Sequence, residues 1–325
     1  DRKEIDEDLV KAATTRRIVD RLFGYKISPV LWSTLQKNMK FVQGRLSAGR
    51  VQSSALKIII ERERLRQSFN SAVYFDLKAK LSTEDKNFEA TLIRIDGKRI
   101  ATGKDFDPDT GKLKNNNVYL LTEVEANKLV KDLNAGQWSI SEIEEKIKKS
   151  NPKPPFTTST LQQEAARKLR FSARRTMNNA QNLYRSGFIT YMRTDSTNLS
   201  AEGLNGAKAE IINSFGKEYL PDKPRVYASK VVNAQEAHEA IRPAGLKFAD
   251  VNNVKTELDE DAAKLYDLIK KRTLASQMKS AQVKQVSVTI KNQNSDFRAN
   301  GKIVLFPGYM AAYVEGNDEQ NDLKD

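Results

Sequence analysis

The sequence of 325 residues contains no cysteine and only one histidine. Without cysteine the chain can form no disulfide, no cysteine-ligated zinc finger and no thiol nucleophile, which is compatible with a reducing compartment. It also has no apolar run of membrane-spanning length and no secretory segment at its start. These absences exclude a disulfide scaffold and a zinc finger, and they predict a cytoplasmic protein without a membrane partner.

Acidic residues are outnumbered by basic ones, with 42 Asp and Glu against 55 Lys and Arg, so the formal net charge is +13. A positive surplus favours a polyanionic partner, because Lys and Arg contacts displace counterions from phosphates. A basic surface that only keeps the protein soluble is the alternative that charge alone leaves open. The length is sufficient for two or more domains and a substantial core.

The N-terminal part of the chain follows a helical period from residue 8 to residue 66. Gly24 is expected to end the first helix of this part. Ser47 is expected to cap a long later helix in which Val51 and Ile58 face a core.

Beyond this part the period changes to that of strands. Residues 73–81 alternate apolar with polar side chains, and Asp96-Gly97 is a strong hairpin signal. Residues 151–155 form a proline-rich linker, helical patterns follow it, and alternation returns from Val283. The sequence therefore predicts a multidomain α+β protein.

Two acidic clusters superficially resemble metal sites. Asp105, Asp107 and Asp109 alternate as in a calcium loop, but Thr110 replaces the required glycine and Asn116 the bidentate glutamate. The acidic run at 259–261 suits the first turn of a helix, where the dipole favours negative charge. Neither cluster is interpreted as a metal site.

A polar segment after Gly187 contains the best candidate for chemistry. Tyr191 follows a short extended stretch, and Arg193 comes two residues later. A tyrosine hydroxyl can act as a nucleophile while a guanidinium stabilises the charge that develops. Taken alone, a half-buried amphipathic tyrosine is the commoner interpretation of such a position.

The full string Tyr-Met-Arg-Thr-Asp-Ser, from Tyr191 to Ser196, closely resembles the active-site segment of type IA DNA topoisomerases. Four further strings are similar to the same family: Thr15–Leu22 with Gly24-Tyr25, Leu46–Ser53, Pro155–Gln163 and Ala237–Pro243. The resemblance covers nearly the whole chain, and Ala244 departs from the Ser or Thr usual in the family.

The resemblance implies that Tyr191 attacks a phosphodiester of single-stranded DNA and stays joined to the 5′ phosphate. Arg193 would stabilise the reacting phosphate and His238 would position it. The residues that would bind DNA are Arg16, Arg17, Asp20, Tyr25, Ser47, Arg50, Gln52, Thr194, Asp195 and Arg242. Basic residues between 167 and 185 are expected to add an electropositive wall beside Tyr191.

The resemblance also implies the gate and arch of this family, in which a helical domain carrying the tyrosine interrupts a β-rich domain. The expected division is a helical base segment over 1–67, the first part of the β-rich arch over 68–150, the helical domain over 151–278 and the second part of the arch over 279–325. No acidic Toprim motif occurs, so the chain is interpreted as a piece of a longer bacterial protein that lacks the N-terminal Toprim domain and the C-terminal region.

The reaction implied is transient cleavage of one strand, strand passage and religation, which relaxes negatively supercoiled DNA without ATP. Mg²⁺ is expected in the full enzyme with ligands in the Toprim domain, and no metal is expected in this piece. The implied partners are single-stranded DNA, negatively supercoiled duplex DNA, and the protein's own Toprim and C-terminal domains in the bacterial nucleoid. Alone, the piece is expected to bind single strands without relaxing DNA.

Three alternatives remain at this stage. A topoisomerase III or reverse-gyrase relative would share the chemistry and differ in its task. A non-catalytic module that binds single strands would use the tyrosine only to stack on a base. A tyrosine recombinase fits poorly, since such sites need several histidines and arginines and the chain has one histidine.

Overall fold

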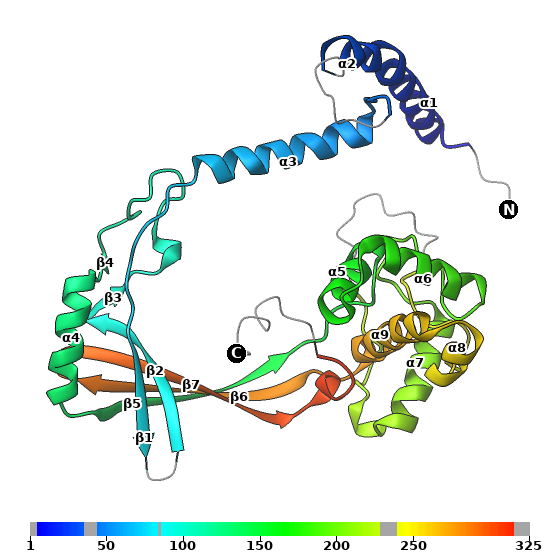
Figure 1. The fold of residues 1–325 in the computed structure, drawn as a ribbon. Helices are drawn as coiled ribbons and strands as arrows, with labels where there is room; N and C mark the ends of the chain where they lie inside the picture. Colours follow the sequence, from blue (N-terminus) through cyan, green and yellow to red (C-terminus); the bar gives the residue numbers. More distant parts are fainter. Residues whose placement is uncertain (1–4, 36–43, 84–85, 228–238, 315–325) are drawn as a thin grey trace. The chain divides into compact units, whose positions relative to one another are not determined.

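The computed structural model describes residues 5–35, 44–83, 86–227 and 239–314 (Figure 1). The chain forms two compact units. The first consists of residues 1–79, 91–137 and 292–296, and the second of residues 80–90, 138–291 and 297–325. The boundary between the units passes through strands, and the four-part division expected from the sequence stays a prediction. The α+β class is confirmed.

In the described part of the first unit, three α-helices precede the strands. They are α1 at Glu7–Leu22, α2 at Ser28–Thr34 and α3 at Arg50–Ser68. Gly24 does not end the helical path as predicted, because a π-helical turn at Phe23–Ile27 carries the chain from α1 into α2. One exposed glycine costs only about 1 kcal/mol in a helix, and here the chain tolerates it.

The long helix α3 begins later than predicted and leaves its apolar side chains uncovered. Gly49, not Ser47, occupies the N-cap position. Val51 is 70% exposed and Ile58 is 67% exposed, so the prediction that they face a core is wrong. The sequence pattern identified an amphipathic helix, but α3 has no buried residue.

The strands form one mixed sheet. They are β1 at Lys78–Thr83, β2 at Lys86–Ile95, β3 at Lys98–Ile100, β4 at Val118–Tyr119, β5 at Ser139–Ser150, β6 at Ala281–Asn292 and β7 at Ser295–Phe306. The order is β4-β3-β2-β7-β6-β5, with β1 beside β2. Strands that follow the helical segment thus pair with strands that precede it, which confirms the expected insertion. Asp96 and Gly97 both have positive φ in the β2–β3 turn, as that hairpin type requires.

Smaller elements in the first unit also follow local signals. Helix α4 at Glu123–Ala135 starts with a capping box between Thr122 and Glu125. Asp105 ends a short 3₁₀ turn at Gly103–Asp105, and its carboxylate pairs with Arg99 at 2.5 Å. Hydrogen bonds from Arg99 and Thr102 hold the pKa of Asp105 well below its usual range.

Five helices of the second unit pack around one core (Figure 1). They are α5 at Thr158–Leu169, α6 at Ala173–Arg185, α7 at Ala201–Ser214, α8 at Val251–Glu257 and α9 at Glu260–Gln277; 3₁₀ turns lie at Lys217–Tyr219 and Gly308–Ala311. Helix α9 is central, with Leu265, Tyr266 and Ile269 fully buried. Asp259 caps it, so the acidic run lies at a helix start as predicted.

Replacing Leu265 by alanine is expected to lower the free energy of unfolding by about 2–5 kcal/mol, because a cavity forms in this core. Leu246 is 60% exposed in the same unit. Leu246→Ala is the matched control and should change stability by no more than about 0.5 kcal/mol. Urea unfolding of both variants checks the placement of α9; equal effects would contradict it.

Candidate active site

Burial alternates along the segment from Tyr191 to Asp195. Met192 and Thr194 are buried, whereas Tyr191, Arg193 and Asp195 are exposed. Tyr191 is 45% exposed, and no described residue forms a hydrogen bond with its hydroxyl or an ion pair with Arg193. Both groups are therefore accessible to a ligand.

The start of this segment is joined to residues 240–243. The Thr190 amide donates to the Arg242 carbonyl at 2.9 Å, and its hydroxyl donates to the Ala240 carbonyl at 2.7 Å. The Arg242 amide donates to the Thr190 hydroxyl oxygen at 3.0 Å. An antiparallel bridge links Ile189 with Pro243. These bonds fix the residue immediately before the tyrosine.

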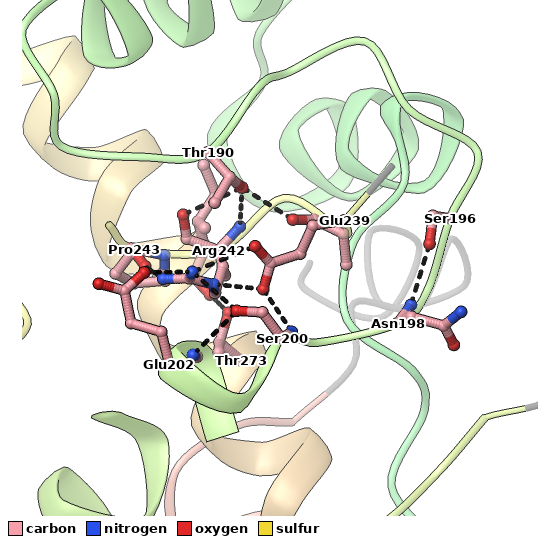
Figure 2. A network of polar contacts seen from close by, with 12 residues as sticks. Thr190, Ser196, Asn198, Ser200, Glu202, Glu239, Arg242, Pro243 and Thr273 are labelled. Atoms are coloured by element: carbon pink, nitrogen blue, oxygen red, sulfur yellow. Dashed lines mark hydrogen bonds and ion pairs between the residues drawn. The ribbon is translucent and has the colours of Figure 1, made fainter. Parts of the chain in front are cut away.

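A buried network behind these bonds centres on the Arg242 guanidinium (Figure 2). Its Nε donates to Glu239 at 2.6 Å, one terminal nitrogen donates to the Pro243 carbonyl at 2.7 Å, and the other lies 3.0 Å from Glu202. The Ser200 amide donates to Glu239 at 2.7 Å. The network joins the end of the polar segment to the strand-like stretch beside Thr190.

A glycine makes room for this network. A Cβ at Gly203 would lie 2.5 Å from Nε of Arg242, which is closer than real contacts allow. Helix α7 can therefore approach the guanidinium only with glycine at this position.

Burial opposes the charge of Glu239, yet the hydrogen bonds from Arg242 and Ser200 outweigh it and lower the pKa of this carboxyl. Burial by itself would lower the pKa of Arg242, but the hydrogen bonds and negative charges of Glu239 and Glu202 together raise it. Both groups are therefore charged at neutral pH, as expected for a buried pair with its donors and acceptors satisfied.

The family resemblance predicts DNA contacts for Arg242 and Thr194, but the structure turns both inward. Arg242 is 2% exposed and its donors bind groups of the protein. Thr194 is 7% exposed, and its hydroxyl oxygen accepts the Ser196 amide at 3.0 Å. In this geometry they hold the segment, while Asp195 stays exposed.

The expected electropositive wall is partly neutralised. Arg175 forms an ion pair with Asp261 at 2.6 Å and lies over the Phe171 ring. Arg167 lies 3.7 Å from the buried carboxylate of Glu164. These basic side chains therefore contribute less free positive charge than their number indicates.

Two neighbours of the segment are absent from the predicted site. Tyr184, in the last turn of α6, contacts the Tyr191 ring edge to face with centroids 5.3 Å apart. The Thr158 hydroxyl bonds the backbone on both sides of Arg193. Thr158 lies within a string quoted for the family resemblance, but only the fold shows what its hydroxyl contacts.

A second group of predicted DNA-binding residues lies in the first unit. Nε of Arg50 donates to Asp20 at 2.6 Å, and Nε2 of Gln52 donates to the Ser47 carbonyl and hydroxyl at 2.8 and 2.9 Å. Other members of the group, Arg16, Arg17 and Tyr25, are exposed, and the Arg21 guanidinium lies 5.7 Å from the Tyr25 ring centre. The structure thus brings together Asp20 with Arg50 and Ser47 with Gln52.

His238 lies outside the described residues, so its predicted role stays a prediction. Among the described residues no group of three His, Cys, Asp or Glu could hold a metal ion.

Comparison with known proteins shows the class to which this chain belongs. Residues 4–325 match the family model described as DNA topoisomerase. The relatives are bacterial: DNA topoisomerase 1 of Synechocystis sp. is 49% identical over 318 residues, 98% of this chain, and that of Mycobacterium tuberculosis is 49% identical over 331 residues. Full-length topoisomerase I from Thermotoga maritima is similar in structure, with a TM-score of 0.70, 32% identity and 97% of this chain covered. The chain belongs to the bacterial type IA DNA topoisomerases.

The chain spans about a third of the length of these curated relatives, 34% for the Synechocystis protein and 35% for the mycobacterial one. It covers 49% of the Thermotoga maritima chain. In the described part of the sequence, no helix has both the length and the apolar character needed to cross a membrane.

Glu239→Gln is expected to reduce the free energy of unfolding by about 1–3 kcal/mol at neutral pH, because a charged hydrogen-bond acceptor of Arg242 is lost. The pKa of Glu239 is lowered in the folded state, so its contribution exists above the ordinary Glu pKa of about 4.3 and disappears as the pH falls through the folded value. Urea unfolding near neutral pH and in acid measures the difference.

Glu257, an exposed residue of α8, provides the control for this experiment. Glu257→Gln should leave stability nearly unchanged at both pH values. A wild-type advantage over Glu239→Gln that persists undiminished in acid would contradict the ionic role of Glu239.

Proposed function

We propose that this chain carries the nucleophile with which a type IA DNA topoisomerase transiently cleaves one DNA strand. The observation that carries the proposal is that Tyr191 and Arg193, two residues apart, are both exposed on a segment held at Thr190. A hydroxyl with no described partner can meet a phosphate, and a cation two residues away can stabilise its charge.

The reaction proposed is exchange of one phosphodiester for another. Oη of Tyr191 forms a bond to phosphorus while the bond from phosphorus to the 3′ oxygen breaks. The phenolic proton is transferred overall to the leaving 3′ oxygen. The tyrosine is then joined to the 5′ phosphate, and Arg193 stabilises charge on the phosphoryl oxygens. The reverse exchange reseals the strand after passage of another strand, so no ATP is consumed.

The helices of the first unit are proposed to orient the single strand. Arg16, Arg17 and Arg50 would contact phosphates, and the exposed ring of Tyr25 would stack on a base. Asp20 would act through Arg50, because a carboxylate that repels a phosphate directly can still orient a guanidinium.

The remainder of the proposal concerns groups beyond this chain. Mg²⁺ and its ligands are expected in a Toprim domain of the full enzyme, and C-terminal domains are expected to bind DNA as well. Relaxation of negatively supercoiled DNA in the bacterial nucleoid is assigned to that whole protein, with this chain as its gate and arch. Exposed apolar residues of α3 support packing against such further parts.

A second candidate function is supported by the pair of exposed rings at Tyr184 and Tyr191, which are 43% and 45% exposed. Two aromatic rings beside basic side chains suit base stacking in a non-catalytic module for single strands. A topoisomerase III or reverse-gyrase type of enzyme would use the same site geometry for a different task.

Tyr191→Phe is expected to abolish the covalent adduct with DNA while leaving single-strand affinity unchanged, because only the nucleophilic oxygen is removed. The assay uses a 3′-labelled single-stranded oligonucleotide with Mg²⁺, with and without a separately supplied Toprim domain. A labelled protein band that depends on the Tyr191 hydroxyl supports the cleavage mechanism.

Tyr184→Phe is the matched control, since it removes a neighbouring phenolic oxygen and keeps the ring. It should retain the adduct. An adduct in the Tyr191→Phe variant would contradict the assignment of Tyr191 as the nucleophile. Binding of DNA without any adduct in the wild type would favour the non-catalytic stacking module.

Removing two positive charges, with Arg16 and Arg17 both changed to Gln, should weaken binding of single-stranded DNA. Each lost phosphate contact reduces the slope of log affinity against log salt by about 0.7, so the double change should reduce it by about 1.4. Titrations at several salt concentrations measure the slope.

Arg66→Gln removes one charge from α3 whose guanidinium already pairs with Glu63 at 2.7 Å. It should leave the salt slope unchanged. Equal effects of the two sets of substitutions would show that only net charge matters and would contradict a DNA path over α1.

A further inference from the structure

The Thr158 side chain contacts the candidate active segment at two neighbouring places. Its hydroxyl oxygen lies 2.8 Å from the Met192 carbonyl and accepts the Thr194 amide at 2.9 Å. The Thr158 amide donates to the Thr194 carbonyl at 2.9 Å. These bonds hold the backbone on both sides of Arg193.

The hydroxyl is not needed to start the helix to which it belongs. Thr157 is the N-cap of α5, and its hydroxyl oxygen accepts the Thr160 amide, with a reciprocal bond from the Thr157 amide to the Thr160 hydroxyl. Removing the Thr158 hydroxyl therefore leaves the capping box intact. Its hydrogen-bonding capacity is directed to the segment that carries Arg193.

Two threonine hydroxyls hold the two ends of the stretch that carries Tyr191 and Arg193. Thr190 is bonded to residues 240–242 just before Tyr191, and Thr158 is bonded to the residues that flank Arg193. Between these anchors, Tyr191 and Arg193 have no described hydrogen-bond partner of their own. Their relative position therefore depends on the backbone that the anchors fix.

We propose that Thr158 is a positioning residue for strand cleavage, whose hydroxyl holds Arg193 in register with the Tyr191 nucleophile. The proposal rests on the function proposed above. Reactive groups must meet within a few tenths of an ångström, and a displacement of about 1 Å can cost about 100-fold in rate. Without the hydroxyl, the backbone at 192–194 keeps the bond from the Thr158 amide but loses those at the Met192 carbonyl and the Thr194 amide, so Arg193 can shift while both reactive side chains remain.

The test compares Thr158→Val with Thr158→Ser in the full-length protein. Valine keeps the shape and removes the hydroxyl, whereas serine keeps the hydroxyl. Single-turnover formation of the covalent adduct should slow by roughly 10- to 100-fold in Thr158→Val. The Kd for single-stranded DNA should stay unchanged, and Thr158→Ser should restore the rate.

Thr176→Val is the matched control, because Thr176 is a fully buried threonine of α6 whose hydroxyl bonds only to the Ser172 carbonyl. It should leave the adduct rate unchanged at a comparable loss of thermal stability. If both valine variants slow cleavage in proportion to their loss of stability, Thr158 is merely structural and the proposal is overturned.

A second measurement reports position without metal or turnover. With 3-fluorotyrosine at position 191, the ¹⁹F resonance should shift or broaden in Thr158→Val and return in Thr158→Ser. An unchanged resonance together with an unchanged rate overturns the proposal. Tyr191→Phe distinguishes failure of the proposed function from failure of this inference. If the Tyr191→Phe variant still forms the adduct, the proposed function is overturned. If Tyr191→Phe forms no adduct while Thr158→Val forms it at the wild-type rate, only the role of Thr158 is overturned.

Discussion

The register of residues 189–194 between two other segments is the constraint on which the candidate site depends. On one side the Thr190 amide bonds to the Arg242 carbonyl, and on the other the Thr158 amide bonds to the Thr194 carbonyl. Because exposed and buried side chains alternate from Tyr191 to Asp195, a slip of one residue would bury Tyr191 and expose Met192. Each bond contributes only about 1 kcal/mol, but together they select one of two incompatible arrangements.

Two arginines near this segment show how burial decides the role of one residue type. Arg242 is surrounded by Glu239, Glu202 and the Pro243 carbonyl, which use its donors inside the protein. Arg193 is exposed, and no described residue forms an ion pair with it. A buried guanidinium whose donors are used inside the protein is a scaffold element, whereas an exposed one can bind a phosphate.

Local signals in the sequence predicted turns and periods but not every helix end, since Gly24 does not end the first helical path and Gly49, not Ser47, caps α3. The Asp96-Gly97 turn follows from a short-range pattern, and the insertion of helices between paired strands follows from the family resemblance. The burial of Arg242 could not be predicted, because two of its partners, Ser200 and Glu202, lie about 40 positions away in the sequence. The contacts of Thr158 depend on the same kind of long-range pairing.

The two units differ in how far their apolar side chains are buried. The helical core of the second unit buries its large side chains, whereas α1 and α3 of the first unit have no buried residue. Apolar surface of that extent is normally covered in a working protein.

The segment that carries Tyr191 also needs other groups for the proposed reaction. A phenol is mostly protonated at neutral pH and needs a base or a nearby cation to react. In the proposed reaction Arg193 supplies the cation, and no described residue accepts a hydrogen bond from the Tyr191 hydroxyl. The fold thus holds the proposed nucleophile and its proposed charge partner on one anchored segment.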